Sequence, residues 1–266
     1  RLYQALYRKW RPQTFADVIG QQHITDTLRA QLQSGRLSHA YLFTGTRGTG
    51  KTTCAKILAR AVNCEHPVNG GPCNECAACR GILDGSVLDV TEIDAASNNG
   101  VDNIRDLRDE TRYTPAQVRK RVFIIDEVHM LSIGAFNALL KTLEEPPEHV
   151  LFILATTELH KVPATILSRC QRFDFRRIGA EDISRRLLDV AAGEGIALTE
   201  GAARLIARLA DGAMRDALSM LDRAAAAGAV DEKTVTAALG VMGQDDGIRL
   251  AEHLKTGDLA AAVGLL

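Results

Sequence analysis

Gly45-Thr46-Arg47-Gly48-Thr49-Gly50-Lys51-Thr52 is the stretch that decides the fold. It follows the apolar run Ala40-Tyr41-Leu42-Phe43-Thr44, which predicts a buried strand, and it precedes residues 53–62, whose apolar residues have helical spacing. A glycine turn before an ordinary helix is the plain alternative, but strand, glycine-rich loop and helix in this order are typical of a phosphate-binding loop. In such a loop the backbone N–H groups face phosphate, Lys51 neutralises it, and the Thr52 hydroxyl holds Mg²⁺.

A second apolar run ends in two adjacent carboxylates. Arg121-Val122-Phe123-Ile124-Ile125-Asp126-Glu127 predicts a central buried strand, and ligands of open α/β sheets bind at the carboxyl ends of such strands. Asp126 suits Mg²⁺ coordination, usually through water, and Glu127 suits polarising an attacking water. Downstream of a phosphate-binding loop, this pair indicates nucleotide hydrolysis.

Four cysteines follow the phosphate-binding loop at the spacing C-x8-C-x2-C-x2-C: Cys64, Cys73, Cys76 and Cys79. Thiolates at this spacing suit tetrahedral Zn²⁺, and a full set of ligands leaves no open position, so the expected zinc is structural. Disulfide pairing is the rival interpretation, which a reducing compartment disfavours. His66 lies inside the loop and is the alternative fourth ligand.

Three further residues stand where a polar group would act on a nucleotide. Residues 150–155 predict a strand that ends before Thr157, which would face the γ-phosphate or the attacking water unless strand propensity alone explains it. Arg169 follows an expected loop and is either a surface residue or a finger that reaches a neighbouring subunit's nucleotide. Arg215 begins an expected helix, where the helix dipole disfavours a cation, which suggests a partner anion such as phosphate.

The basic and aromatic opening Arg8-Lys9-Trp10-Arg11-Pro12 has two interpretations. It is a solvated charge run with an apolar anchor, or a segment that lies over the nucleotide base, since an adenine ring needs apolar or flat partners. Apolar residues, among them Val18, follow it. The arginines of the charged segment 101–113 likewise suit a solvated helix face.

Composition sets the outer limits of function. The chain has 266 residues, 46% of them hydrophobic and 24% charged, which favours a globular protein of two domains. It has no apolar run of membrane-spanning length and no apolar signal segment, so we expect a cytoplasmic protein, and a fragment of a longer one. The formal net charge of −1 predicts no nucleic-acid binding by itself. Contact with DNA would need a local basic face or an assembly.

The composition changes at Gly179, where strand-like runs end and alanine-rich helical segments begin. We therefore expect an α/β nucleotide-binding domain over residues 1–178, with a zinc module at about 64–79. A small all-helical domain is expected over 179–243, and a further helical stretch that the chain does not complete over 244–266. The helical segments expected in the second part are 181–192, 199–210, 213–227 and 230–239.

Several of these features together resemble one family. The basic opening from Tyr7 to Pro12, the phosphate-binding loop, the four cysteines, Asp126-Glu127-Val128-His129, residues 140–147 and Ser168-Arg169-Cys170 resemble the gamma/tau subunits of bacterial clamp loaders. These are AAA+ ATPases of the DNA polymerase III holoenzyme, a DNA-directed DNA polymerase. The resemblance covers essentially the whole chain, and the cysteines with Ser-Arg-Cys are far more specific than the loop alone.

The resemblance implies a fold and a set of residue roles. The fold is a RecA-like parallel-sheet AAA+ domain with a zinc-binding insertion, followed by a helical lid and the start of a helical collar. Lys51 and Thr52 would bind ATP phosphate and Mg²⁺, and Asp126 would support the metal. The remaining implied roles are Glu127 as catalytic base, Thr157 as first sensor, Arg215 as lid sensor, Arg169 as the finger in the next subunit's site, and Arg11 and Val18 near the adenine.

The resemblance also implies partners. The family loads a ring-shaped sliding clamp onto primed DNA from a five-subunit arc of delta, delta-prime and gamma/tau copies. The resemblance is also compatible with this chain being a monomer by itself. ATP binding would close the arc and open the clamp, and hydrolysis on primer–template DNA would release it. Arg105 and Lys141 are the candidates for contact with the DNA backbone. That patch is thin, because its neighbours Asn98 and Gly100 are uncharged.

Three rival functions remain from the residues alone. A branch-migration helicase subunit fits the loop and the two carboxylates but not the four cysteines. A non-hydrolysing scaffold that binds nucleotide or DNA through zinc is disfavoured by the intact Lys51, Asp126, Glu127 and Arg169. A small-molecule kinase gives no reason for an arginine that acts on a neighbouring subunit.

Overall fold

The computed structural model describes residues 3–226, 228–240 and 244–257. Its contacts divide the chain into two compact units, with the boundary at Ile178 and Gly179. We call Arg11–Ile178 the sheet unit, and residues 3–10 together with the described residues from Gly179 onward the helical unit. The sequence predicts that residues 1–178 form the α/β domain, whereas the contacts of residues 3–10 lie in the helical unit.

The sheet unit is built on a five-stranded sheet in the order β2-β3-β4-β1-β5, and all neighbouring strands run parallel. The parallel α/β fold that the sequence predicts is therefore confirmed. The carboxyl ends of β1, β3 and β4 meet at one edge of this sheet, where the phosphate-binding loop also begins. The strands are β1 Ala40–Thr44, β2 Val90–Asp94, β3 Arg121–Asp126, β4 Val150–Thr156 and β5 Gln171–Asp174.

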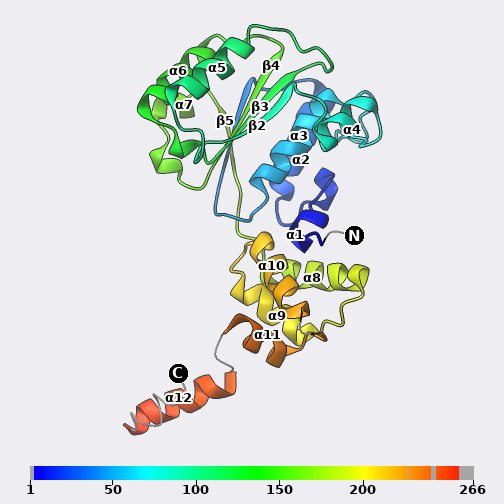
Figure 1. Ribbon diagram of the computed structural model, residues 1–266, viewed down its shortest axis with the longest axis vertical. Coiled ribbons are helices and arrows are strands. Elements are labelled where there is room, and N and C mark those ends of the chain that lie inside the picture. The colour runs from blue at the N-terminus through cyan, green and yellow to red at the C-terminus, as the bar shows by residue number, and fades with distance from the viewer. Residues whose placement is uncertain (1–2, 227, 241–243, 258–266) are drawn as a thin grey trace. The chain divides into compact units, whose positions relative to one another are not determined.

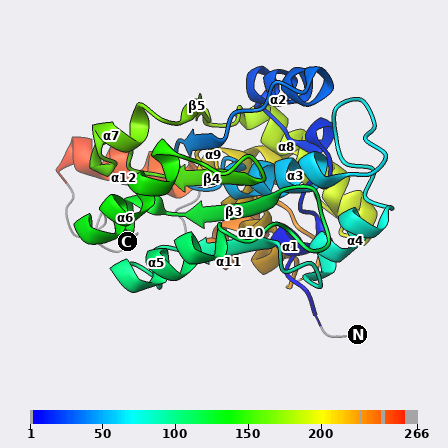
Figure 2. The same ribbon diagram turned by 90° about the horizontal axis from the view of Figure 1, so that it is seen from above.

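Helices cover both faces of the sheet because the inner strands are apolar on both sides. Tyr41 and Phe43 of β1 join the core under α2 and α3, whereas Leu42 joins the core under α5 and α6. Figure 1 and Figure 2 show the two helical layers with the strands between them. The helices and 3-10 turns of this unit are η1 Phe15–Asp17, α2 Gln22–Ser34, α3 Lys51–Asn63, α4 Ala77–Asp84, α5 Val101–Glu110, η2 Val128–Met130, α6 Ile133–Glu144, η3 Leu159–Lys161 and α7 Ala164–Leu167.

Helix ends follow local sequence signals. The Ser132 side chain accepts a hydrogen bond from the Ala135 N–H at 3.2 Å, which confirms the expected cap at the start of α6. Gly35 ends α2 in the left-handed conformation, with φ of 68°.

The strand β5 has no clear signal in the sequence. Only Phe173 of its four residues is buried, because β5 is the edge strand. Phe173 meets Phe43 edge to face, with ring centroids 5.9 Å apart, and its ring centroid lies 6.0 Å from that of Tyr41. These aromatic contacts join a polar strand to the core.

The helical unit consists of short helices, as the sequence predicts. The N-terminal segment packs within it: the Trp10 indole Nε1 donates to Glu194 Oε1 at 2.6 Å, and the Lys9 ammonium pairs with the same carboxylate at 2.6 Å. A Cβ on Gly193 would lie 2.5 Å from the Trp10 ring, so this position requires glycine. The helices are α1 Leu6–Lys9, α8 Ala180–Glu194, α9 Glu200–Leu209, α10 Met214–Ala225, α11 Glu232–Leu239 and α12 Gln244–Thr256.

The structure describes only part of the expected collar segment. The expected collar segment 244–266 corresponds to α12 in part, and its residues 258–266 lie outside the described residues. Among the described residues, no helix combines the length and the apolar character that crossing a membrane requires.

Candidate nucleotide site and metal centre

The phosphate-binding loop connects β1 to α3 and depends on glycine backbone conformations. Gly50 caps α3 with φ of 106°, a left-handed conformation that is strained for residues other than glycine. Gly45 has φ of 142°, and a Cβ there would clash with the carbonyl oxygen of Phe175. The loop therefore curls tightly over the N-terminus of α3, whose free N–H groups suit an anion.

Lys51 lies buried under this loop, with 6% of its surface exposed. Its Nζ donates to the carbonyl oxygens of Gly45 at 2.8 Å and Thr46 at 2.9 Å. Burial lowers the pKa of Lys51, while the nearby carboxylates of Glu127 and Asp126 oppose that shift. The ammonium is thus held where a phosphate oxygen could replace a loop carbonyl.

Asp126 links the loop helix to the end of β3. The Thr52 hydroxyl donates to Asp126 Oδ2 at 2.7 Å, and Asp126 Oδ1 accepts the Glu127 N–H at 2.9 Å. Thr52 and Asp126 lie far apart in the sequence, yet their side chains are in contact. This contact agrees with the resemblance, which places both residues in one site. Their oxygens are hard ligands that suit Mg²⁺, which keeps several of its own waters.

Glu127 follows β3 in the left-handed region, with φ of 49°, which is uncommon for a residue other than glycine. Its Oε2 accepts hydrogen bonds from the Thr157 hydroxyl at 2.9 Å and the Thr157 N–H at 3.3 Å. The carboxylate at the end of β3 is therefore tied to the residue that follows β4. The structure brings Lys51, Thr52, Asp126, Glu127 and Thr157 to one edge of the sheet; their roles stay predictions.

The two residues expected near the adenine flank α3. Arg11 Nε donates to the Thr53 hydroxyl at 3.2 Å. Val18 is buried, and its Cγ1 would lie 3.8 Å from a Cβ on Gly50. Both residues lie beside the loop that precedes α3, and the adenine contact itself stays a prediction.

The two arginines expected to sense or complete the site have partners within their own units. Arg169 pairs with Glu144 Oε1 at 2.7 Å and donates to the Thr165 carbonyl oxygen at 2.8 Å. In the helical unit, the Arg215 guanidinium lies 4.8 Å from the ring centroid of Tyr7. These contacts hold both side chains but do not test the predicted roles.

The two DNA candidates lie on neighbouring helices of the sheet unit. Arg105 on α5 pairs with Asp102 at 3.0 Å, and both side chains are more than half exposed. Lys141 is exposed on α6, which packs against α5. DNA contact by this face stays a prediction.

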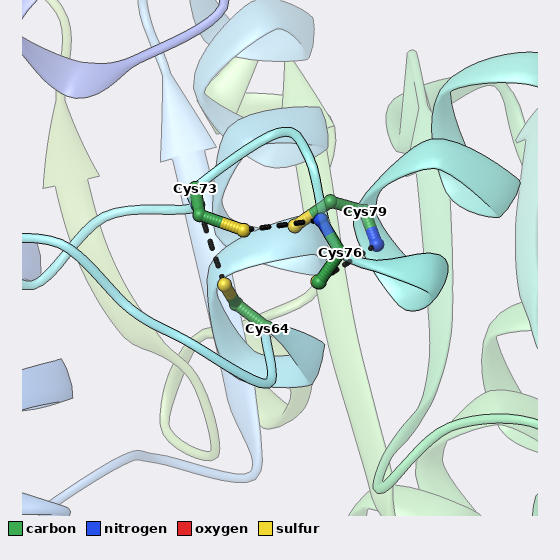
Figure 3. A group of neighbouring side chains, drawn as sticks. All are labelled: Cys64, Cys73, Cys76 and Cys79. Carbon is green, nitrogen blue, oxygen red and sulfur yellow. Dashed lines mark hydrogen bonds between the residues drawn. The ribbon is translucent and has the colours of Figure 1, made fainter.

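The four cysteines come together beside the end of α3. Their sulfur atoms all lie within 4.8 Å of one another, and all four are free thiols (Figure 3). Tetrahedral zinc with Zn–S bonds of about 2.3 Å would hold its sulfur ligands roughly 3.8 Å apart, so a small inward movement completes the site. The donor set therefore fits a structural zinc ion, with no place for His66 in the cluster that the described residues form.

Backbone amides surround these sulfur atoms, as expected for thiolate ligands. The Cys73 N–H donates to Cys64 Sγ at 3.3 Å, and the Cys79 N–H donates to Cys76 Sγ at 3.4 Å. The N–H groups of Glu75 and Cys76 point at Cys73 Sγ and lower the pKa of Cys73 to about 6, because they stabilise the charged sulfur.

The cysteine module also contacts the segment that precedes Val18. Arg60 of α3 is 4% exposed, and it donates through Nε to Asn74 Oδ1 at 3.1 Å and through Nη2 to the Gln13 carbonyl at 2.9 Å. Asn74 Nδ2 donates to the same carbonyl at 3.1 Å. The module thus supports the chain between Arg11 and Val18 from outside the nucleotide site.

Comparisons with known proteins identify the family. Residues 20–179 match the family model described as DNA polymerase III, delta subunit, and residues 182–230 match that of the DNA polymerase III clamp loader subunit, ATPase lid domain. The tau subunit of DNA polymerase III from Bacillus subtilis is 64% identical over 222 residues, which are 84% of this chain and 39% of that protein. The chain belongs to the gamma/tau family of DNA polymerase III clamp-loader subunits.

Other relatives of this clamp-loader subunit agree. The Escherichia coli tau subunit is 51% identical over 254 residues, 95% of this chain and 40% of that protein. The Mycobacterium tuberculosis gamma/tau subunit is 46% identical over 244 residues, 91% of this chain and 42% of that protein. The chain thus spans about two fifths of the length of these relatives.

Solved structures show the AAA+ fold. The Thermotoga maritima RuvB Holliday junction branch migration motor aligns with a TM-score of 0.66, covering 96% of this chain and 85% of that one. Its sequence is only 17% identical, so the likeness concerns the fold alone. The fold by itself does not separate a clamp-loader subunit from a branch-migration motor, whereas the close relatives do.

The candidate site also contains residues for which no role was predicted. His129 Nδ1 lies 3.0 Å from the Thr156 hydroxyl and 3.4 Å from Glu127 Oε2. His129 Nε2 lies 3.5 Å from Glu158 Oε1. The only signal in the sequence was their proximity to the motifs: His129 comes two residues after Glu127, and Thr156 and Glu158 flank Thr157.

Proposed function

We propose that this chain is the ATPase part of a clamp loader, in which ATP binding and hydrolysis drive the opening of a sliding clamp and its loading onto primed template DNA. One observation carries the proposal: an ammonium, a hydroxyl and two carboxylates converge at the sheet edge where the phosphate-binding loop begins. These groups are Lys51, Thr52, Asp126 and Glu127. Phosphoryl transfer needs positive charge on the phosphates, a held metal ion and a base near water.

Each group has a distinct part in the proposed reaction. The loop amides and Lys51 would bind the phosphates, and Thr52 and Asp126 would hold Mg²⁺, which would supply positive charge to neutralise the phosphate oxygens. Glu127 accepts a proton from water as the water oxygen bonds to the γ-phosphorus. The bond from that phosphorus to the bridging oxygen breaks, and ADP and inorganic phosphate leave. Thr157 keeps the Glu127 carboxylate in place through its two hydrogen bonds.

In this proposal hydrolysis also needs a second side-chain cation beyond Lys51. Within the sheet unit, Arg169 pairs with Glu144 at the end of α6 and not with Asp126 or Glu127. We propose that Arg169 completes the site of the adjoining subunit, so that each ATP is cut only between two subunits. Arg215 would sense the phosphate from the lid, and the delta, delta-prime and other gamma/tau subunits would complete the arc in the cytoplasmic replisome.

The function is tested by ATP hydrolysis of the full-length subunit assembled with its loader partners. We expect turnover to rise when both the clamp and primed DNA are added, because their binding aligns neighbouring subunits. Unprimed DNA and an excess of clamp alone are the controls. Turnover that does not change when clamp and primed DNA are added contradicts the clamp-loading proposal. It does not contradict the proposed ATP hydrolysis.

We further propose that the cysteine cluster holds one structural zinc ion per chain, which closes the loop between α3 and α4. Elemental analysis of the purified full chain should give one zinc, and Cys73→Ser should remove it, because serine is a poor ligand for this metal. Cys170→Ser is the matched control, since Cys170 lies outside the cluster. A zinc-free chain with paired cysteines would refute this assignment.

A further inference from the structure

His129 is a buried titratable side chain at the nucleotide site that the proposed reaction does not use. It lies in η2, two residues after Glu127, and 5% of its side chain is exposed. Polar side chains this deeply buried are normally hydrogen-bonded, and an imidazole has two nitrogens to satisfy. The partners of these nitrogens therefore indicate what the residue does.

Both nitrogens face carboxylate oxygens. Nδ1 lies 3.0 Å from Thr156 Oγ1 and 3.4 Å from Glu127 Oε2, while Nε2 lies 3.5 Å from Glu158 Oε1. An ionised carboxylate can only accept, so an imidazole nitrogen that bonds to one must carry the hydrogen. Thr156 Oγ1 already accepts the Glu158 N–H at 3.0 Å, and Glu158 also pairs with Lys161 at 2.6 Å. His129 thus joins the end of β3 to the segment after β4.

The Glu127 carboxylate depends on neighbouring side chains for its orientation, because it is on a flexible side chain that is one-third exposed. Glu127 itself has the left-handed backbone conformation, with φ of 49°. Thr157 holds Oε2 with a hydroxyl and an N–H. His129 Nδ1 lies 3.4 Å from the same oxygen and 3.0 Å from Thr156 Oγ1, so groups from two elements stand beside Oε2.

We propose that His129 is a positioning residue for Glu127: its Nδ1–H holds Glu127 Oε2 beside Thr157, in the orientation from which the carboxylate accepts a proton from the attacking water. This inference rests on the proposed ATPase function. In this proposal the hydrogen on Nδ1 positions Glu127, whereas Nε2 only contacts Glu158. Nucleotide binding does not depend on it, because Lys51 and the loop bind the phosphates.

Three substitutions of His129 distinguish the roles of its two ring nitrogens. The amide nitrogen of asparagine occupies nearly the place of Nδ1, the amide nitrogen of glutamine nearly that of Nε2, and leucine keeps volume without either donor. The full-length subunits carrying His129→Asn, His129→Gln or His129→Leu are assembled with the loader partners. For each, kcat and KM for ATP are measured, together with the Kd of a non-hydrolysed ATP analogue and the thermal midpoint of unfolding.

We expect His129→Gln and His129→Leu to lower kcat about tenfold or more, since displacement of a catalytic group by about 1 Å can cost on the order of 100-fold. His129→Asn should stay within about threefold of the unchanged protein, and the Kd of the analogue should stay within about twofold in all three, differences below 1 kcal/mol. A kcat that is unchanged in His129→Leu, or equally reduced in the asparagine and glutamine variants, overturns the inference.

Glu127→Gln separates this inference from the function on which it rests. Loss of hydrolysis in Glu127→Gln with an unchanged His129→Leu rejects only the positioning role. Full hydrolysis in Glu127→Gln rejects Glu127 as the base, and the positioning role falls with it. Lower thermal midpoints with kcat unchanged would assign His129 a structural role and also contradict the proposal.

Discussion

Replacing Arg169 with alanine is expected to abolish ATP hydrolysis by the assembled clamp loader while ATP binding stays nearly unchanged. The guanidinium would neutralise charge on the transferring phosphoryl group, and such an arginine is worth roughly 10³- to 10⁵-fold in kcat. The ground state needs it far less, because Lys51 and the loop amides already face the phosphates. The measurement is steady-state turnover of the assembly, together with calorimetry of a non-hydrolysed analogue.

Arg169→Ala should lower the free energy of unfolding too little to explain a loss of turnover. Arg169 makes one ion pair with Glu144, and the two side chains are 32% and 45% exposed, so the pair is screened by solvent and contributes about 0–1 kcal/mol. Arg172→Ala is the matched control, because Arg172 lies three residues further on, is half exposed and pairs with Asp174. Unchanged turnover of the assembled Arg169→Ala protein would reject the finger role.

Mixed assemblies test whether Arg169 acts on a neighbour. An Arg169→Ala subunit keeps an intact Lys51, and a Lys51→Ala subunit keeps an intact Arg169. Where the two are adjacent in the right order, one complete site forms, so mixing two inactive proteins should restore part of the turnover. Two inactive proteins that stay inactive on mixing would indicate that Arg169 acts within its own chain.

The second large effect is expected for Lys51→Ala, which should lose nucleotide binding. Lys51 is buried, with Nζ hydrogen-bonded to the carbonyls of Gly45 and Thr46. Removing one partner of a buried charge pair costs about 2–5 kcal/mol, or roughly 30-fold to more than 1000-fold in Kd. The alanine variant would also remove the ammonium that offsets the negative charge of Asp126 and Glu127, so these carboxylates would repel the phosphates more strongly.

Titration calorimetry with a non-hydrolysed ATP analogue measures this effect. Lys56→Ala is the control on the same helix, because Lys56 is partly exposed and pairs with Glu92. It should leave the Kd within about twofold of the unchanged protein, a difference of less than 1 kcal/mol. Tight binding of the analogue by Lys51→Ala would remove the lysine from the phosphate site.

Much of the fold follows from the sequence because local signals and core packing agree. The runs 40–44 and 122–125 are buried on both faces, which a strand between two helical layers satisfies. Glycines at Gly45 and Gly50 mark backbone conformations that other residues avoid. The four cysteines come together in space as their spacing indicates.

The parts that the sequence did not reveal depend on contacts between distant segments. The strand β5 is polar outside Phe173, so its pattern carries almost no signal. The contact of Trp10 with Glu194 joins residues that are 184 positions apart in the chain. The approach of His129 to Thr156 joins the segment after β3 to the end of β4, two strands that pair in the sheet.

We propose that an ATP bound by one subunit is cut only with a cation from its neighbour. Comparing ATP turnover per site in the isolated, monomeric chain and in the complete assembly, at saturating ATP and Mg²⁺, tests this arrangement. We expect negligible turnover by the monomer and full turnover in the assembly. Turnover by the monomer at the rate of the assembly would contradict it.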